Sequence, residues 1–328
     1  MKLAKKKYSL GCCRMWLLVA AGLLLVACDQ QPSRFSDARY PMKAKEVAPG
    51  VYAVITPARD FPNPENKGWN SNAGFIVTEE GVLVFDTGSS ETIGKVLKAT
   101  IRGITDKPVK WIINSHGHGD HWLGNKAVAE KGTEIIATSK VQHRIDNEGH
   151  EWIDRFNRMT KGETGESGIL APNTIVDEKS ERDFGGVKAE LIPSGDSHSP
   201  GDIVLWLPEL KVLMAGDVVI ADRAPGTFDS NIPQWIRFLA ELEALKPNVV
   251  IPGHGGVHDV GAITELHDFF QQLWDIVAQG YKDGQQDFEI ATTVRRKLGH
   301  YADTMAGFDR RIGETVSHVY LQVEESAF

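Results

Sequence analysis

The sequence predicts an α/β fold in which two β-rich halves pack into a single domain. Short apolar runs of strand length alternate with longer amphipathic segments of helical length. The scheme of the first half recurs in the second half, without a sequence repeat. In both halves, histidine and aspartate residues follow apolar runs. Because ligand sites gather at strand ends where two such halves meet, these residues are expected to share one site.

The first half is expected to contain a hairpin followed by strands that alternate with helices. The turn Glu79-Glu80-Gly81 separates the two strands of the hairpin. A polar, Gly-rich segment at 161–172 is expected to form a loop. The predicted strands are 51–55, 73–77, 82–85, 109–114 and 135–137, and the predicted helices are 92–104, 121–130 and 139–159.

The second half is expected to repeat this scheme and to end in helices. Its last two helices place apolar residues at the spacing of a core-facing stripe. The predicted strands are 187–192, 203–207, 212–214 and 249–251, and the predicted helices are 234–245, 263–277 and 312–323.

Seven potential metal ligands lie between residues 116 and 254. Four of them occur within the six residues His-Gly-His-Gly-Asp-His, and the other three lie in short motifs with glycine or proline. The seven are His116, His118, Asp120, His121, His198, Asp217 and His254. A lone histidine is more often a packed or surface residue, but the combined motifs favour a metal centre.

The types of these residues indicate which metals and which chemistry the centre would use. Neutral imidazole and carboxylate suit borderline divalent metals, with zinc as the first candidate. Seven ligands are too many for one tetrahedral ion and indicate two ions. Two dications about 3.5–4 Å apart can share a hydroxide and lower the pKa of water to about 7. Asp120 is then also the candidate for moving a proton to the leaving group.

The N-terminus is predicted to be a targeting segment. Residues 1–27 contain five basic residues and no acidic residue, and 15–27 form an apolar stretch of 13 residues. That stretch is short for a transmembrane helix. It ends in Leu25-Val26-Ala27-Cys28, which resembles the bacterial lipoprotein box, in which the cysteine is diacylated. An ordinary signal peptide or an anchor helix is the alternative.

The lipoprotein motif implies a division of the chain and a location. Residues 1–27 are expected to be removed, 28–48 to form a tether, and 49–328 to form the domain. Lipidated Cys28 would attach the protein to a membrane that faces the bacterial periplasm. Asp29 follows the cysteine directly, and its resemblance to the enterobacterial sorting rule favours the inner membrane.

Composition excludes several other classes of function. Cys12 and Cys13 lie in the segment to be removed, and Cys28 would be lipidated. The mature domain therefore lacks a disulfide, a thiol nucleophile and a thiolate ligand. Residues 1–27 carry five of the 36 basic residues and none of the 44 acidic ones, so the mature chain has a net charge of −13. This charge argues against nucleic acid as a partner and leaves a small-molecule substrate as the expectation.

With the segment Gly81-Val82-Leu83-Val84-Phe85-Asp86-Thr87-Gly88, the ligand motifs resemble the metallo-β-lactamase fold superfamily. The resemblance implies a four-layer αββα sandwich with the metal site at one edge. It implies one metal at His116, His118 and His198, a second at Asp120, His121 and His254, and Asp217 as the bridge between them. It also implies that Asp86 orients the His-rich loop by hydrogen bonding. A turn or helix-capping role is the alternative for Asp86.

Asp217 makes the chain look like the glyoxalase-II-like hydrolases of this superfamily. The zinc β-lactamases of two subclasses have a cysteine at the corresponding position, and no cysteine is available here. The chain also resembles the exported quinoprotein relay system zinc metallohydrolases, which are associated with quinoprotein dehydrogenases. That likeness is carried by the segments 72–77 and 111–116 and by Tyr320 and Glu324.

Three segments are expected to form the walls of the substrate pocket: 57–71, 152–172 and 220–231. Trp69 and Phe61 are candidates for an apolar flap, and a packed aromatic residue is the alternative for each. Arg223 is a candidate for binding a substrate carboxylate through two hydrogen bonds, and a solvated loop arginine is the alternative. Asn231 is a further pocket candidate.

Four functions stay open at this point. The first is a periplasmic, lipid-anchored dinuclear zinc hydrolase acting on a small ester, thioester, lactone or amide. The second is a β-lactamase. The third is an iron-dependent persulfide dioxygenase, which resembles this fold and uses one metal held by two histidines and one aspartate. The fourth is a non-enzymatic accessory or binding protein. The complete ligand set favours a hydrolase with two metals.

Overall fold

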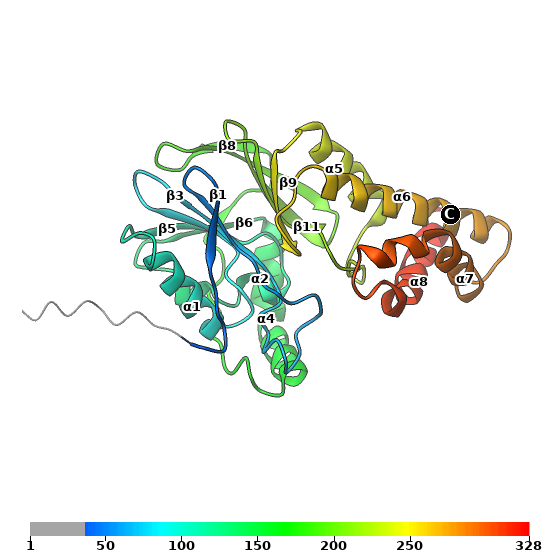
Figure 1. Cartoon of the computed structure of the whole chain (residues 1–328), viewed down its shortest axis with the longest axis horizontal. Helices are drawn as coiled ribbons and strands as arrows, with labels where there is room; N and C mark the ends of the chain where they lie inside the picture. Colours follow the sequence, from blue (N-terminus) through cyan, green and yellow to red (C-terminus); the bar gives the residue numbers. More distant parts are fainter. Residues whose placement is uncertain (1–36, 328) are drawn as a thin grey trace, which may run out of the picture. The chain divides into compact units, whose positions relative to one another are not determined.

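Two β-sheets pack against each other between layers of helices in the computed structural model, which describes residues 37–327 (Figure 1). The described residues belong to one compact unit. The predicted signal peptide 1–27, Cys28 and the first part of the predicted tether lie outside the described residues.

The first sheet has seven strands, which follow one another in the order of the sequence. Strands β1 to β4 pair in antiparallel fashion, and β4 to β7 pair in parallel with a helix or helices in each of their connections. The strands are β1 (Ala44–Ala48), β2 (Val51–Val54), β3 (Ala73–Val77), β4 (Val82–Phe85), β5 (Val109–Ile113), β6 (Glu134–Ala137) and β7 (Thr174–Ile175).

The second sheet has five strands in the order β12-β11-β10-β9-β8. Only β11 and β12 pair in parallel, and α5 lies in the connection between them. The strands are β8 (Ser180–Asp183), β9 (Lys188–Asp196), β10 (Pro200–Leu207), β11 (Val212–Ile220) and β12 (Val249–His254).

Helices cover the outer face of each sheet. The helix α1 packs on the first sheet, and the helices α5 to α8 form one apolar cluster with the second sheet (Figure 1). The α-helices are α1 (Glu91–Arg102), α2 (Gly119–Trp122), α3 (Asn125–Val128), α4 (Ser139–Thr160), α5 (Ile232–Ala244), α6 (Gly261–Lys282), α7 (Asp287–Leu298) and α8 (Phe308–Ser326). Within the described residues, none of the helices combines the length and the apolar character needed to cross a membrane.

The layers follow from the two-residue period of the strands. In β4, Leu83 and Phe85 point between the sheets, whereas Val82 and Val84 pack under α1. Strand β10 behaves in the same way, with Leu205 between the sheets and its neighbours under the helices. Strands that are buried on both faces need apolar residues at every position. The predicted four-layer αββα arrangement is thereby confirmed.

The structure corrects the predicted start of the domain. The segment Ala44–Ala48, predicted to belong to the tether, is strand β1 and pairs with β2. Tyr40 is also buried, at 2% exposure, in the apolar cluster around α1. The folded part therefore begins before residue 49, because these residues complete the edge of the first sheet.

The predicted helix 121–130 is instead two short helices, α2 and α3. The chain bends between them at Gly124, which approaches the preceding loop closely. A Cβ atom at Gly124 would lie 2.1 Å from the carbonyl oxygen of Thr87. The N–H of Gly124 donates to the carbonyl oxygen of Gly88 at 3.1 Å and so leaves the helix; helical periodicity does not encode this bond between distant segments. Strands β1, β7 and β8 and helix α7 were not predicted.

Replacing Phe270 by alanine tests the packing of the C-terminal helices on the second sheet. Phe270 is 0% exposed, and its ring centroid lies 4.5 Å from that of Trp235. We expect the free energy of unfolding to fall by about 3–5 kcal/mol, because the change leaves a cavity in the core. Phe288→Ala is the control: Phe288 is 70% exposed, so its loss should change stability by no more than about 0.5 kcal/mol. Equal effects of both variants in urea denaturation would contradict the packing described.

Candidate metal centre

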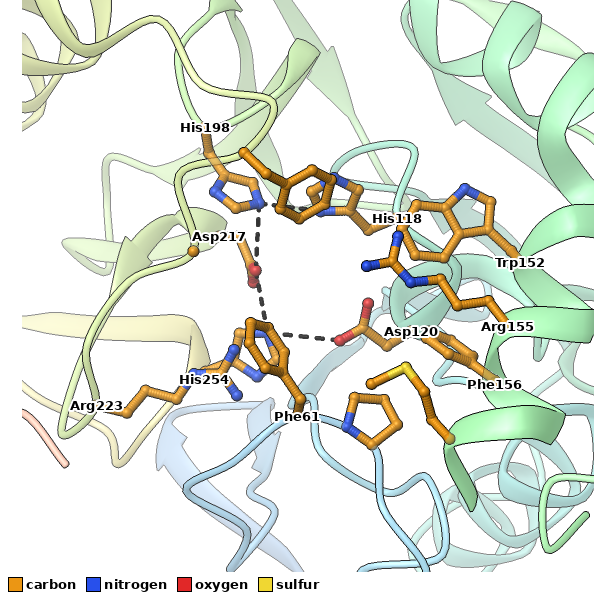
Figure 2. Close-up of a pocket in the computed structure, with 14 residues that line it drawn as sticks. Phe61, His118, Asp120, Trp152, Arg155, Phe156, His198, Asp217, Arg223 and His254 are labelled. Carbon is orange, nitrogen blue, oxygen red and sulfur yellow. Dashed lines mark hydrogen bonds and ion pairs between the residues drawn. The ribbon is translucent and has the colours of Figure 1, made fainter. Parts of the chain in front are cut away.

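All seven predicted ligands meet where strands of both sheets end. His116 and His118 follow β5, Asp120 and His121 lie in α2, His198 connects β9 to β10, Asp217 lies in β11, and His254 ends β12. Every one of these side chains is buried, and none is more than 8% exposed. Figure 2 shows five of them around a common pocket. The two halves of the chain thus supply one site together.

The ligand atoms form two groups. One contains His116, His118, His198 and Asp217, and the other contains Asp120, His121 and His254. Within each group, one ligand atom from every residue lies within 4.8 Å of the others. The five histidines and Asp120 divide as the family resemblance implied, and Asp217, expected between the two metals, falls in the first group.

Distances in the first group fit a tetrahedral ion. Nδ1 of His118 lies 3.0 Å from Nε2 of His116 and 3.1 Å from Nε2 of His198. Ligand nitrogens at about 2.0–2.1 Å from a tetrahedral zinc ion lie roughly 3.3 Å apart. Three ring nitrogens that point at one another from this distance are well arranged to share a cation.

The second group is wider. Oδ2 of Asp120 lies 3.7 Å from Nε2 of His121 and 3.6 Å from Nε2 of His254. These separations are compatible with ligands at about 2.0–2.2 Å from one ion.

Asp217 lies between the two groups. One of its oxygens is 3.2 Å from Nε2 of His121, and the other is 3.0 Å from Nε2 of His254 and 3.5 Å from Nε2 of His198. Oδ1 of Asp217 and Nε2 of His121 are buried and have no hydrogen-bond partner among the described residues. Buried polar atoms are rarely left without partners, so this pair fits a bound cation.

Four of the five histidines have a hydrogen-bond partner on the nitrogen that faces away from the metal position. His121 Nδ1 lies 2.8 Å from Asp86 Oδ2, and His254 Nδ1 lies 2.6 Å from the carbonyl oxygen of Asn70. His116 Nδ1 lies 2.9 Å from Ser115 Oγ. Such partners fix the tautomer and orientation of metal-binding imidazoles. Nδ1 of His198 has no partner among the described residues.

Asp86 connects two of these contacts. Its Oδ1 accepts from Ser115 N at 2.8 Å, and its Oδ2 accepts from Ser115 Oγ at 2.7 Å and from His121 at 2.8 Å. The backbone of Asp86 has a φ of 62°, a left-handed conformation that aspartate tolerates better than most residues. The hydrogen-bonding contacts expected of Asp86 are present, and they join the end of β4 to the His-rich loop.

The surroundings of three ligands favour the protonation states that metal binding needs. Burial lowers the pKa of His198 to about 3 and holds the pKa of His116 well below its ordinary value. For Asp217, burial acts to raise the pKa, but His254 and His121 outweigh it and hold the pKa well below its ordinary value. Two imidazoles are thus neutral and the carboxylate is ionised, as metal binding requires.

His121 behaves differently because three carboxylates surround it. Burial acts to lower its pKa, but Asp217, Asp120 and Asp86 outweigh burial and raise the pKa well above its ordinary value. The position at Nε2 therefore favours a cation, and either a proton or a metal ion can supply that charge.

Asp229, which no sequence motif indicated, is the hydrogen-bond acceptor for His118, the remaining histidine. Oδ2 of Asp229 accepts from Nε2 of His118 at 3.0 Å and pairs with Arg144 at 2.8 Å. Because Nδ1 of His118 faces the metal position, the ring proton belongs on Nε2. A metal-binding histidine needs an acceptor for its second ring nitrogen, so the sequence could have predicted that His118 has one. No local motif identifies which residue supplies this acceptor.

A pocket opens above the ligands, with walls from α4 and from the loops that carry Phe61 and Phe228 (Figure 2). Arg223, His118, Asp120 and His254 face it. All three predicted wall segments thus contribute residues to the pocket. Phe61 and Arg223, both considered as candidates for its wall, line it. The alternative of a solvated loop position for Arg223 is wrong, because this residue is only 2% exposed.

Two predicted pocket residues lie elsewhere. Trp69 is 7% exposed and packs in the apolar cluster between the first sheet and α1, so it is a core residue. Asn231 precedes α5, and its side chain accepts a hydrogen bond from the backbone N–H of Gln234 at 3.0 Å. Asn231 is therefore a helix cap and not a wall of the pocket.

Asp229→Ala should lower the affinity for zinc by about 10- to 100-fold, because His118 would lose the acceptor that fixes its ring. The measurement is a competition titration of the metal-free protein with a zinc chelator. Asp196→Ala is a control, since Asp196 forms an exposed pair with Lys140 at 2.6 Å. An unchanged zinc affinity in Asp229→Ala would show that His118 needs no such support.

Comparisons with known proteins agree with this geometry. A family model described as the metallo-beta-lactamase superfamily matches residues 66–254, more than half of the chain. A linear primary-alkylsulfatase from Pseudomonas sp. is 26% identical over 62% of this chain, which spans only 44% of that protein. The metallo-beta-lactamase IND-1 of Chryseobacterium indologenes is 26% identical over 58% of this chain and 76% of its own length.

A solved structure shares the fold over a larger part of this chain. The sec-alkylsulfatase Pisa1 from Pseudomonas sp. matches 86% of this chain and 50% of its own, with a TM-score of 0.67 and 18% identity. The relatives that match are metal-dependent hydrolases, as predicted for this chain. The fold, the paired ligand groups and the family match lead to one conclusion: the chain belongs to the metallo-beta-lactamase superfamily.

Proposed function

We propose that this protein is a dinuclear zinc hydrolase that cleaves a small ester, thioester, lactone or amide. One observation carries the proposal: two groups of ligand atoms, with Asp217 between them, lie beside a pocket. Zinc ions held by these groups would polarise the bond to be cleaved and activate water at neutral pH.

Asp120 is placed to handle protons during the reaction. Nδ2 of Asn70 donates a hydrogen bond to its Oδ2 at 2.8 Å and thereby orients the carboxylate. No hydrogen bond within the described residues involves its other oxygen, and Asp120 lines the pocket. This second oxygen can accept a proton from water and pass it to the leaving group.

A second candidate function is the hydrolysis of an alkyl sulfate ester. Both an alkylsulfatase sequence and an alkylsulfatase structure are similar to this chain. The pocket also combines apolar side chains with Arg155 and Arg223, a composition suited to an alkyl group and an anion. Because the chain spans about half of those proteins or less, this function is a proposal from similarity and pocket composition.

The other functions considered receive less support. β-Lactamase activity is suggested by named relatives, but Asp217 stands where the resemblance implies a cysteine in two subclasses. A mononuclear iron dioxygenase needs one ligand group, and this site has two. A purely accessory role does not explain the pocket beside the metal ligands. Association with quinoprotein dehydrogenases stays a prediction.

Removing the metals should abolish hydrolysis, and zinc should restore it. We expect about two zinc ions per chain by elemental analysis of the mature protein. Asp120→Asn should lower kcat by about 10²- to 10⁴-fold, because an amide cannot carry the proton. The substrates to test are a phenyl ester, a thioester, an alkyl sulfate and a chromogenic cephalosporin. One iron per chain with oxygen uptake on a persulfide would overturn the proposal, and so would full activity in Asp120→Asn.

We further propose that Cys28 is lipidated and that the protein faces the periplasm at the inner membrane. The support is the basic and apolar N-terminal segment that ends in Leu25-Val26-Ala27-Cys28, followed by Asp29. Cys28→Ser should abolish incorporation of labelled fatty acid and prevent removal of residues 1–27 by the lipoprotein peptidase. Wild-type protein without the label, or found in the outer membrane after fractionation, would contradict this location.

A further inference from the structure

Phe61 lies in the wall of the pocket, and its ring contacts residues from the C-terminal half of the chain (Figure 2). The guanidinium carbon of Arg311, in α8, lies 3.7 Å from the centroid of the Phe61 ring, and that of Arg223 lies 5.5 Å from it. A Cβ atom at Gly226 would lie 3.8 Å from Cζ of the same ring. Phe61 therefore reaches from its own loop, between β2 and β3, to the loop after β11.

Asp60 attaches the same segment to α8. Its Oδ1 accepts hydrogen bonds from Arg310 at 2.8 Å and from Arg311 at 3.3 Å. Its carbonyl oxygen accepts another from Arg223 at 3.3 Å. Burial acts to raise the pKa of Asp60, but the N–H of Phe61 and the guanidinium of Arg310 outweigh burial and lower the pKa. The carboxylate is therefore ionised at neutral pH and forms true ion pairs with α8.

The tip of this loop, residues 57–62, depends on such contacts because its backbone is not paired. Among the described residues, none of its N–H or C=O groups forms a hydrogen bond with another backbone group. The side chains of Asn63 and Asn66 donate to the carbonyl oxygen of Phe61, but these bonds are local to the loop. A segment with few backbone hydrogen bonds can open at a low cost in free energy. The contacts of Asp60 with distant residues therefore decide where the tip lies.

The ion pair of Asp60 with Arg311 is the best protected of these contacts. Arg311 is only 6% exposed, and its other terminal nitrogen donates to the carbonyl oxygen of Ala224 at 3.1 Å. One guanidinium thus joins the tip to the loop after β11. The side chains of Arg310 and Arg59, which form the other ion pairs of the tip, are 62% and 38% exposed. Exposed ion pairs contribute less, so Arg311 carries most of the attachment.

Helix stability does not explain the two arginines of α8. The helix begins at Phe308, so Arg310 and Arg311 are its third and fourth residues. Positive side chains in the first turn of a helix are opposed by the helix dipole. Asp60 offsets this cost from a position 250 residues earlier in the chain. The arginines are therefore placed for a contact outside their own helix.

The superfamily match does not imply this contact. Asp60 and Phe61 precede residues 66–254, which match the family model, and Arg310 and Arg311 follow them. The contact thus joins two segments on either side of the matched region, and it does so at the wall of a pocket that the matched region's ligands line.

We propose that α8 controls access to the metal centre: its ion pairs with Asp60 form a latch that holds the tip 57–62 in place, with Phe61 in the pocket wall. When the latch opens, the tip moves away and the pocket widens towards solvent. This inference goes beyond the proposed function, and its tests do not require turnover.

The first test measures the rate at which phenanthroline removes zinc from the zinc-loaded protein, as a second-order rate constant. This chelator is neutral, so the charge of the pocket does not attract it. Asp60→Asn and Arg311→Met should each raise the rate constant about 10-fold, because each removes a charge-assisted hydrogen bond of the latch. Asp196→Asn is the matched control, since it makes the same change in the exposed pair with Lys140 and should alter the rate by no more than about twofold.

Two further measurements distinguish a latch from a general loss of stability. Phe61→Ala should also raise the rate, and Asp60→Asn should add no more than about twofold in that background, because the latch acts through Phe61. Raising the salt concentration from about 0.05 M to about 0.5 M should speed zinc removal from the wild type but not from Asp60→Asn, because salt screens the partly exposed ion pairs. Full additivity of the two substitutions, or an equal salt effect in wild type and variant, would contradict the latch.

The position of Phe61 can also be followed without any metal. Fluorophenylalanine introduced at position 61 gives one fluorine NMR resonance in the metal-free protein. In Asp60→Asn this resonance should move towards its position in the urea-unfolded chain, whereas Asp196→Asn should leave it unchanged. Arg310→Met, a change at an exposed side chain, should move it in the same direction and replaces Arg311→Met if that variant does not fold.

An unchanged fluorine resonance together with an unchanged rate of zinc removal in Asp60→Asn would overturn the proposal. These outcomes are independent of hydrolysis. A protein in which the latch behaves as described but which cleaves none of the tested substrates contradicts the proposed function only. A protein that cleaves a substrate while Asp60→Asn affects neither readout contradicts this inference only.

Discussion

The carboxylate of Asp217 lies between ligands from both halves of the chain, and the arrangement of the site depends on it. Its two oxygens lie within 3.5 Å of His121, His198 and His254. A carboxylate buried to this depth is stable only beside compensating cations. Two positions for cations follow, one on each side of Asp217, and the imidazoles around it belong to both β-sheets.

The histidines stay in place because the layers behind them supply acceptors. Asp86 at the end of β4 holds His121, and the carbonyl oxygen of Asn70 holds His254. Asn70 also orients Asp120 through its side-chain amide. Metal affinity in this protein is therefore a property of the packed sandwich and not only of the seven side chains.

The loop after β11 connects the centre to the C-terminal helices. On its inner side, Asp229 binds His118, and the ring of Phe228 stacks at 5.0 Å on the same imidazole. On its outer side, His318 and Gln322 of α8 form hydrogen bonds to Thr227 and Ser230. The helices beyond the metal motifs thus hold the loop that brings Arg223 and Phe228 to the pocket.

The ligands were predictable from the sequence because each lies in a short motif whose residue types have few other uses. The alternation of strands and helices was also predictable, because the spacing of apolar residues is a local pattern in the sequence. The prediction of a single helix at 121–130 was wrong because the N–H of Gly124 donates to the distant Gly88 and not to a residue of its own helix. Trp69 is the packed aromatic residue that was its alternative, and Asn231 was misplaced, because an aromatic or amide residue in a loop does not indicate which surface it will face.

The sequence by itself therefore determined the chemistry: imidazole and carboxylate ligands for two metals, no cysteine after residue 28, and an acidic chain. Only the tertiary structure decided how that chemistry is arranged. It selected Asp229 as the acceptor for His118, buried Arg223 beside the pocket, and brought apolar side chains from α4 and from two loops into the pocket wall. The physical reason is that these contacts join residues far apart in the chain, so no local pattern encodes them.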